Sequence, residues 1–150
     1  MIGLASFLKF RELGETYEVS PKLFIACLNR DRLLSYFHHY VWINVGLELS
    51  KALLDEPQDD YKLTVPRLLR KLVSEAPGNQ VVLDRIDILF LPAFQLDVIN
   101  LLRQLDRNKS VVVIWPGFLE GKKLIYSKPD YPDYHTYDLS FYNDVICITD

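Results

Sequence analysis

An aspartate that directly follows a run of apolar residues is the strongest chemical signal in this sequence. Residues 81–83 (Val-Val-Leu) lead into Asp84, and Asp87 follows three residues later. Because a continuous apolar run is typical of a parallel strand buried on both faces, we expect Asp84 at the carboxyl end of such a strand, where open α/β sheets place their ligands. In nucleotide hydrolases an acid at this position, the Walker B acid, holds Mg²⁺. Asp84 and Asp87 are therefore candidate catalytic residues, as a metal ligand and a water-orienting acid. The structural alternative is that Asp84 caps a loop or pairs with an arginine such as Arg85.

A nucleotide site also needs a phosphate-binding loop. This loop is expected directly after the first predicted strand, which covers residues 21–27. The usual Walker A loop, Gly-x-x-x-x-Gly-Lys-[Ser/Thr], uses glycines to bring backbone amides close to the phosphates and a lysine to reach the terminal phosphates. Residues 26–34 instead read Ala-Cys-Leu-Asn-Arg-Asp-Arg-Leu-Leu, with no glycine and no lysine. The cations of this loop are Arg30 and Arg32, and Asp31 adds a negative charge. We therefore predict that the usual phosphate cradle is absent and that no cofactor is bound. ATP and Mg²⁺ enter only the alternative interpretation, in which the loop is unorthodox.

Two arginines follow the apolar face of a predicted helix and are candidates for binding a partner. Arg103 and Arg107 lie on or just after residues 94–105, whose apolar positions recur at helical spacing. An arginine placed here could neutralise transition-state charge at a neighbouring subunit's nucleotide. The alternative is that both are solvated cations favoured by the negative end of the helix dipole.

A tyrosine-rich stretch at residues 128–142 is a second candidate for partner binding. It contains Tyr131, Tyr134 and Tyr137 among prolines and aspartates. Tyrosines are common at protein interfaces, and they can also stack on nucleic-acid bases. Because the interleaved residues are acidic rather than basic, the stretch favours a protein interface, or an extended arm packed on its own sheet, over a base-stacking surface.

Binding to DNA remains an alternative that rests on a local basic face. The cations that could form this face are Arg30, Arg32, Arg67, Arg70, Lys71, Arg107, Lys109, Lys122 and Lys123. The histidines and cysteines are not spaced as metal ligands, so no metal site is predicted.

Composition places the chain among ordinary globular proteins. The 150 residues are 49% apolar and 25% charged, with a net charge of −3, so no overall charge draws the chain to nucleic acid or to anionic lipid. No apolar run reaches the roughly 20 residues that a membrane span needs. The first ten residues lack the basic region and cleavage site of a signal peptide. We therefore expect a cytoplasmic protein that forms one domain and does not engage the membrane.

Helices and strands are expected to alternate along most of the chain. Strands are predicted at residues 21–27, 41–45, 81–84, 110–115 and 145–148, with a turn at 120–123 between two short strands. Helices are predicted at residues 1–12, 33–40 and 46–54, from Pro66 to about residue 75, and over 94–105. This alternation predicts an α/β fold with four or five strands in a mostly parallel central sheet and three layers in all.

Several short motifs, in order and spacing, resemble one known family. They are residues 45–54 (VGLELSKALL), 82–90 (VLDRIDILF), 101–117 (LLRQLDRNKSVVVIWPG) and 126–134 (YSKPDYPDY). The chain thereby resembles the small P-loop protein of type 3 bacteriophage-exclusion (BREX) systems, the BrxF family. The resemblance implies a P-loop NTPase-like fold, a role in defence against phage, and nucleotide binding. This chain departs from the family in nucleotide binding, because it has no Walker A loop.

In a P-loop sheet with strand order 5-1-4-3-2, the first and last strands are neighbours. These strands carry Cys27 and Cys147, and we interpret both cysteines as core residues. Residues 1–150 are thus expected to form a single degenerate P-loop NTPase-like domain.

The sequence favours a non-catalytic assembly or binding subunit of a bacterial anti-phage defence complex. Its expected partners are the other subunits of that complex and further copies of this chain. The alternatives are an active ATPase with a non-standard phosphate loop and a DNA-binding adaptor.

Overall fold

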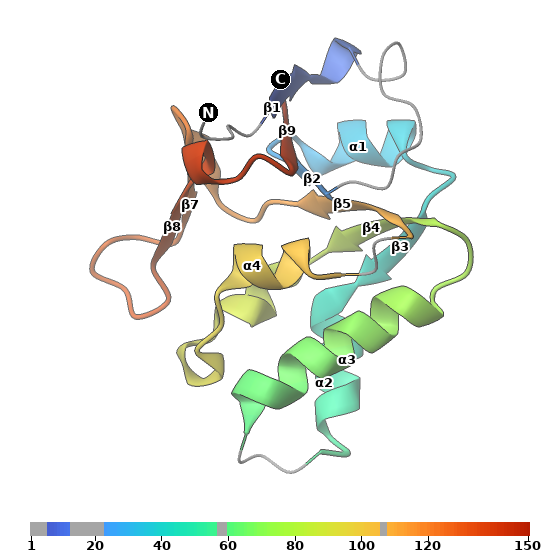
Figure 1. Cartoon of the computed structure of the whole chain (residues 1–150), viewed down its shortest axis with the longest axis vertical. Coiled ribbons are helices and arrows are strands. Elements are labelled where there is room, and N and C mark those ends of the chain that lie inside the picture. Colours follow the sequence, from blue (N-terminus) through green and yellow to red (C-terminus); the bar gives the residue numbers. More distant parts are fainter. Residues whose placement is uncertain (1–5, 13–22, 57–59, 106–107) are drawn as a thin grey trace.

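A six-stranded parallel sheet forms the centre of the molecule (Figure 1). The computed structural model describes residues 6–12, 23–56, 60–105 and 108–150. The strands of the sheet are β1 (Ser6–Lys9), β2 (Leu23–Ala26), β3 (Val41–Asn44), β4 (Gln80–Asp84), β5 (Ser110–Ile114) and β9 (Val145–Thr149). Every neighbouring pair is parallel. The predicted α/β class with a mostly parallel sheet is confirmed, whereas the predicted four or five strands are too few.

The strands lie across the sheet in the order β1-β9-β2-β5-β4-β3. If the edge strand β1 is set aside and the other five are numbered along the chain, they run 5-1-4-3-2. The first and last of these five strands, β2 and β9, are neighbours, with Ile25 opposite Cys147. Cys147 therefore lies on the strand next to β2, and Cys27 is the first residue after β2, so the predicted neighbourhood of the two strands is confirmed.

Helices cover both faces of the sheet. On β2, Leu23 and Ile25 face a large core that includes side chains from α2 (Val45–Leu53), α3 (Tyr61–Glu75) and α4 (Val98–Arg103). Ala26 belongs to a smaller core on the other face, under α1 (Arg30–Tyr36). Figure 1 shows α1 on one side of the strands and the other three helices opposite, so the molecule has three layers.

Two predicted helices differ from the structure in their extent. The helix predicted over 94–105 is confirmed at residues 98–103, which form α4, and is wrong in its first part, since residue 94 ends a short 3₁₀ helix at 92–94. Gln95 adopts the left-handed backbone conformation (φ 51°), which ends the preceding turn, and Asp97 caps a new helix by accepting a bond from the Asn100 N–H (3.1 Å). Pro66 lies inside α3, which begins at Tyr61, and not in its first turn.

The predicted N-terminal helix is also wrong. Residues 6–9 form β1, residues 10–12 form one turn of 3₁₀ helix, and residues 1–5 lie outside the described part of the chain. Leu8 is buried while Phe7 and Lys9 are exposed, which is the alternation of a strand. Parallel pairing with β9 provides partners for the backbone and overrides the weak helical pattern.

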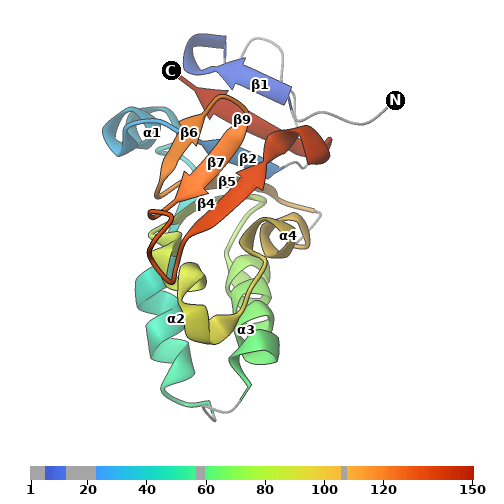
Figure 2. The same cartoon turned by 90° about the vertical axis from the view of Figure 1, so that its left-hand side faces the viewer.

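A second, antiparallel sheet contains β6 (Phe118–Glu120), β7 (Lys123–Tyr126) and β8 (His135–Asp138), and it faces the viewer in Figure 2. The predicted turn at 120–123 is confirmed. The indole of Trp115 donates to the carbonyl oxygen of Ile125 (3.1 Å), which ties this sheet to the end of β5. Gly117 lies against the same carbonyl, because a Cβ there would come within 1.8 Å of the oxygen. The second sheet therefore depends on a close backbone approach at Gly117.

None of the helices in the described residues has the length and apolar character needed to cross a bilayer.

Candidate functional site

The carboxyl edge of the parallel sheet brings together two of the residues that the sequence singled out, Asp84 and Arg30. Asp84 is the last residue of β4, and it lies opposite Asn44, the last residue of β3. Only 7% of the Asp84 side chain is exposed. Asn44 accepts a hydrogen bond from the Leu47 N–H (3.0 Å) and so caps α2. At this edge, the last side chain of β3 thus forms a hydrogen bond with the backbone of the helix that follows it.

Asp84 forms an ion pair with Arg30. The Nη2 atom of Arg30 lies 2.5 Å from Oδ2 of Asp84, and the other carboxylate oxygen, Oδ1, accepts a hydrogen bond from the backbone N–H of Arg85 (3.0 Å). Because a buried carboxylate is costly unless it is paired and hydrogen-bonded, these two contacts account for its stability in this place. The expected pairing with an arginine is found, although its partner is Arg30 and not the side chain of Arg85.

The start of α1 positions Arg30. Asn29 caps this helix by accepting a hydrogen bond from the Asp31 N–H (2.8 Å), and Arg30 is the first helical residue. Strand β5 separates β2 from β4 in the sheet, so Arg30 reaches Asp84 across the end of β5. The segment that follows β2 therefore directs a guanidinium to the buried carboxylate at the end of β4.

The backbone next to Asp84 adopts an unusual conformation. Arg85 has φ 58° and ψ 51°, in the left-handed region that few residues other than glycine occupy. Its carbonyl oxygen lies close to Gly46 in α2, where an added Cβ would come within 3.3 Å of it. No signal in the sequence indicated the left-handed conformation of Arg85. Gly46, by contrast, was recognised as the first residue of the helix predicted at 46–54.

The other two charged candidates, Arg32 and Asp87, lie away from the ion pair between Arg30 and Asp84. Arg32 pairs with Asp150, and its guanidinium lies 4.8 Å from the ring centroid of Phe10. Asp87 is exposed on the 3₁₀ helix at residues 86–90. Partial burial, and then the negative charge of Asp87, raise the pKa of Tyr126. The structure thus brings Arg30 and Asp84 together and places Arg32 and Asp87 in separate contacts.

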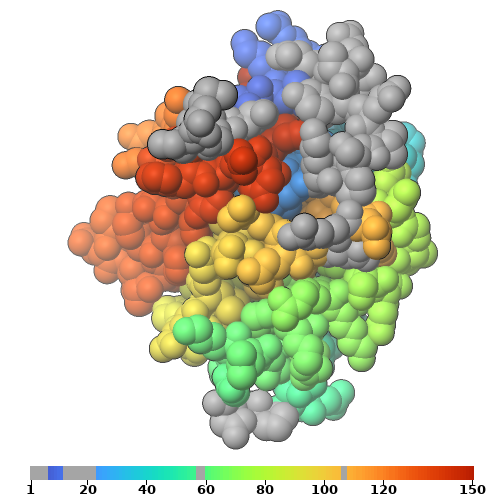
Figure 3. All heavy atoms as spheres, in the orientation of Figure 1, coloured from blue at the N-terminus to red at the C-terminus, as the bar shows by residue number. Residues whose placement is uncertain are grey.

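Arg103 binds an acid of its own chain. Its Nε atom lies 2.9 and 3.0 Å from the two carboxylate oxygens of Asp144, and its guanidinium lies 5.2 Å from the ring centroid of Tyr142. These contacts join α4 to the segment before β9, and the two surfaces adjoin in Figure 3. The guanidinium of Arg103 is thus engaged by side chains of its own chain. Arg107 lies outside the described residues.

The three tyrosines proposed for partner binding have different surroundings. Tyr131 is 55% exposed and Lys128 lies over its ring, whereas Tyr134 is half-buried. Tyr137 is buried, and its hydroxyl accepts a hydrogen bond from the Val98 N–H (2.9 Å) at the start of α4. Burial raises the pKa of Tyr137 to about 12. Tyr131 is therefore the tyrosine with the most surface for a partner, and Tyr137 belongs to the core.

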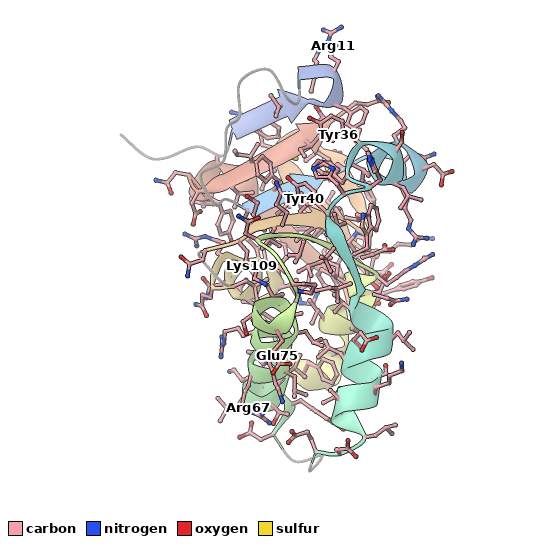
Figure 4. All side chains as sticks on the ribbon, turned by 90° about the vertical axis from the view of Figure 1, so that its right-hand side faces the viewer. Arg11, Tyr36, Tyr40, Arg67, Glu75 and Lys109 are labelled. Atoms are coloured by element: carbon pink, nitrogen blue, oxygen red, sulfur yellow. The ribbon has the colours of Figure 1, made fainter. Side chains whose placement is uncertain are left out.

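Several cations of the predicted basic face are engaged within the chain. Arg67 pairs with Glu56 (2.9 Å). Lys109 is buried at the C-terminal end of α3, where its Nζ donates to the carbonyl oxygens of Val73 (2.8 Å) and Ala76 (2.5 Å) (Figure 4). Four other exposed cations of the set lie on separate elements: Arg70 and Lys71 on α3, Lys122 in the turn after β6, and Lys123 at the start of β7.

Within the part of the chain that the structure describes, no group of three or more histidine, cysteine or acidic side chains is arranged to hold a metal ion. The two free cysteines are in contact, with 3.7 Å between the Sγ atoms of Cys27 and Cys147.

Comparisons with family models, with curated proteins and with solved structures found no match to this chain. The resemblance to the small P-loop protein of BREX systems therefore stays a prediction from the sequence motifs.

Proposed function

We propose that this protein is a non-catalytic, P-loop-like subunit that acts by binding other proteins in a bacterial anti-phage defence complex. The observation that carries the non-catalytic part is the ion pair between Arg30 and Asp84. In an active site of this kind, the acid and the nucleotide phosphates would hold Mg²⁺ jointly. Here a guanidinium supplies the positive charge at the acid, and the loop that carries it has no glycine or lysine for a phosphate.

The strand order supports the P-loop-like part of the proposal. The five strands that follow β1 run 5-1-4-3-2, the order that the resemblance implies, and Asp84 ends the third of them. The strand order and the motifs at residues 82–90 and 101–117 thus both support the proposal of a P-loop-like domain.

Calorimetry of the purified protein with ATP and Mg²⁺ tests the loss of nucleotide binding. We expect no binding to the wild-type protein. Micromolar binding would contradict the proposal and favour the alternative of an ATPase with a non-standard loop. In that case Asp84→Asn should abolish phosphate release while far-UV circular dichroism shows an unchanged fold.

Co-expression with the proteins encoded by adjacent genes tests the role in assembly. We expect co-elution with at least one of them on size-exclusion chromatography, and weaker co-elution for Tyr131→Ala. Leu63→Ala is the matched control, since Leu63 is also a large exposed residue (69%) but lies on α3. Elution of the wild-type chain alone beside every such protein would contradict the assembly role.

Binding to DNA is the other alternative, and the engagement of Arg30, Arg32 and Lys109 within the chain weakens it. A gel-shift assay with duplex DNA at low and moderate salt distinguishes it, because phosphate contacts weaken steeply with salt. A salt-sensitive shift would favour the DNA-binding adaptor over the protein-binding subunit.

A further inference from the structure

We propose that Cys27 and Cys147 are a redox modification site, at which a reversible disulfide joins the end of β2 to β9 in the core sheet. The two sulfur atoms are 3.7 Å apart and both thiols are free. A disulfide needs a separation of about 2.0 Å, so the sulfurs must approach by about 1.7 Å. No other side chain has to leave the space between them, because they already contact each other.

The sheet places both thiols on the same face. Cys147 lies opposite Ile25 in the register of β2 and β9, and Cys27 is two residues beyond Ile25. Side chains two residues apart on a strand point to the same side, so the pair is diagonal across the two strands. Cys27 is the first residue after β2, and its N–H donates to the carbonyl oxygen of Ile148 (2.9 Å). Formation of the bond would draw this end of β2 towards β9.

The two thiols differ in access, which sets an order of reaction. Cys27 is partly exposed, while Cys147 is fully buried. The hydrogen bond between them lowers the pKa of Cys147 and raises the pKa of Cys27. The order of reaction therefore follows from access and not from these pKa values, since Cys27 is the thiol that a reagent can reach.

A small disulfide such as oxidised glutathione is the oxidant in this scheme. Cys27 loses its proton as it attacks one sulfur of glutathione disulfide, and one glutathione leaves as its thiolate and takes up that proton. Cys147 then loses its proton and attacks Sγ of Cys27, which expels the second glutathione. Two protein thiols are oxidised to one disulfide, and one glutathione disulfide is reduced to two glutathione thiols.

The modification would act on the candidate site through the chain. Cys27 is followed by Leu28, by the helix cap Asn29 and then by Arg30, so a displacement at Cys27 is transmitted to the residue that pairs with Asp84. This consequence follows from connectivity and does not depend on whether the protein belongs to a defence complex.

The test is incubation of the purified full chain with oxidised glutathione, alkylation of the remaining thiols, and mass spectrometry. We expect the wild-type protein to lose two hydrogen atoms, to resist alkylation, and to yield a linked peptide pair containing Cys27 and Cys147 that a dithiol reductant separates. Cys147→Ala should accumulate a stable glutathione adduct on Cys27, and Cys27→Ala should stay unmodified because Cys147 is buried.

Three results would overturn the proposal. These are alkylation of both thiols in the wild-type protein after prolonged oxidation, a stable glutathione adduct on wild-type Cys27, and a disulfide between two copies of the chain. Because Cys147→Ala changes a core residue, far-UV circular dichroism accompanies each variant, and the peptide mapping of the wild-type protein decides the question without any substitution.

Discussion

Arg30 balances the charge of the buried carboxylate of Asp84 from the far side of strand β5, since its Nη2 atom lies 2.5 Å from Oδ2. Removal of the guanidinium leaves a carboxylate that is only 7% exposed with one backbone donor, the Arg85 N–H. We expect Arg30→Ala to lower the free energy of unfolding by about 1–3 kcal/mol, measured by urea denaturation. Arg70→Ala, which removes an exposed cation on α3, should change it by less than about 0.5 kcal/mol. Equal effects of the two variants would show that the ion pair contributes nothing specific.

Lys109 should stabilise the end of α3. Its Nζ donates to the carbonyl oxygens of Val73 and Ala76 at the C-terminal end of the helix, where the last carbonyls have no N–H four residues further along a helix. The Val73 oxygen also accepts from the Ala76 N–H (3.3 Å), so Lys109 is its second donor. Lys109→Met keeps the length of the side chain and removes both donors, and we expect a loss of about 2 kcal/mol in urea denaturation. Lys71→Met, at an exposed position of the same helix, is the control and should be nearly neutral. A neutral Lys109→Met would contradict a capping role.

Gly117 should tolerate no side chain. A Cβ at this position would meet the carbonyl oxygen of Ile125 at 1.8 Å, so Gly117→Ala must displace β7 and break the bond from the Trp115 indole. We expect a loss of about 3 kcal/mol or more and a changed tryptophan emission spectrum. Gly46→Ala, with its nearest contact at 3.3 Å, should change stability by no more than about 1 kcal/mol. The reverse ranking of the two variants would contradict the close approach at Gly117.

Tyr137 should make stability fall at alkaline pH. Burial raises its pKa to about 12 in the folded protein, while an unfolded tyrosine titrates near pH 10. The folded state therefore holds this proton more tightly, so the contribution is fully present below about pH 10 and is lost as the pH rises through about 12. Urea denaturation between pH 9 and 12 should show a smaller decline for Tyr137→Phe than for the wild-type protein. A parallel decline in both would contradict the assignment to Tyr137.

Much of the central sheet could be predicted from the sequence. The apolar runs before Asp84 and Trp115 are long and β-branched, and each became a buried strand close to its expected bounds. The N-terminal segment could not be predicted, because its strand exists only through pairing with β9, which is distant in the sequence. The helix expected over 94–105 begins only at Val98 for a local reason, since the left-handed conformation of Gln95 leaves no trace in hydrophobic spacing.

The candidate site could be predicted in its parts but not in its pairing. Asp84 and Arg30 were both recognised from their positions after strands, yet the sequence does not show that the first residue of α1 reaches across β5. The burial of Lys109 was also hidden, because a lysine in a polar segment is typical of an exposed residue. Both contacts join residues that are far apart in the sequence, so no local sequence pattern indicates them.

The place of β9 has a consequence for the biosynthesis of the protein. This strand comes last along the chain, but it lies between β1, the first strand, and β2. As the polypeptide leaves the ribosome, β1 emerges early and has no neighbour to pair with until β9 has followed. The sheet can therefore close only after synthesis has reached residues 145–149, and its assembly depends on a pairing between distant segments of the kind that slows folding.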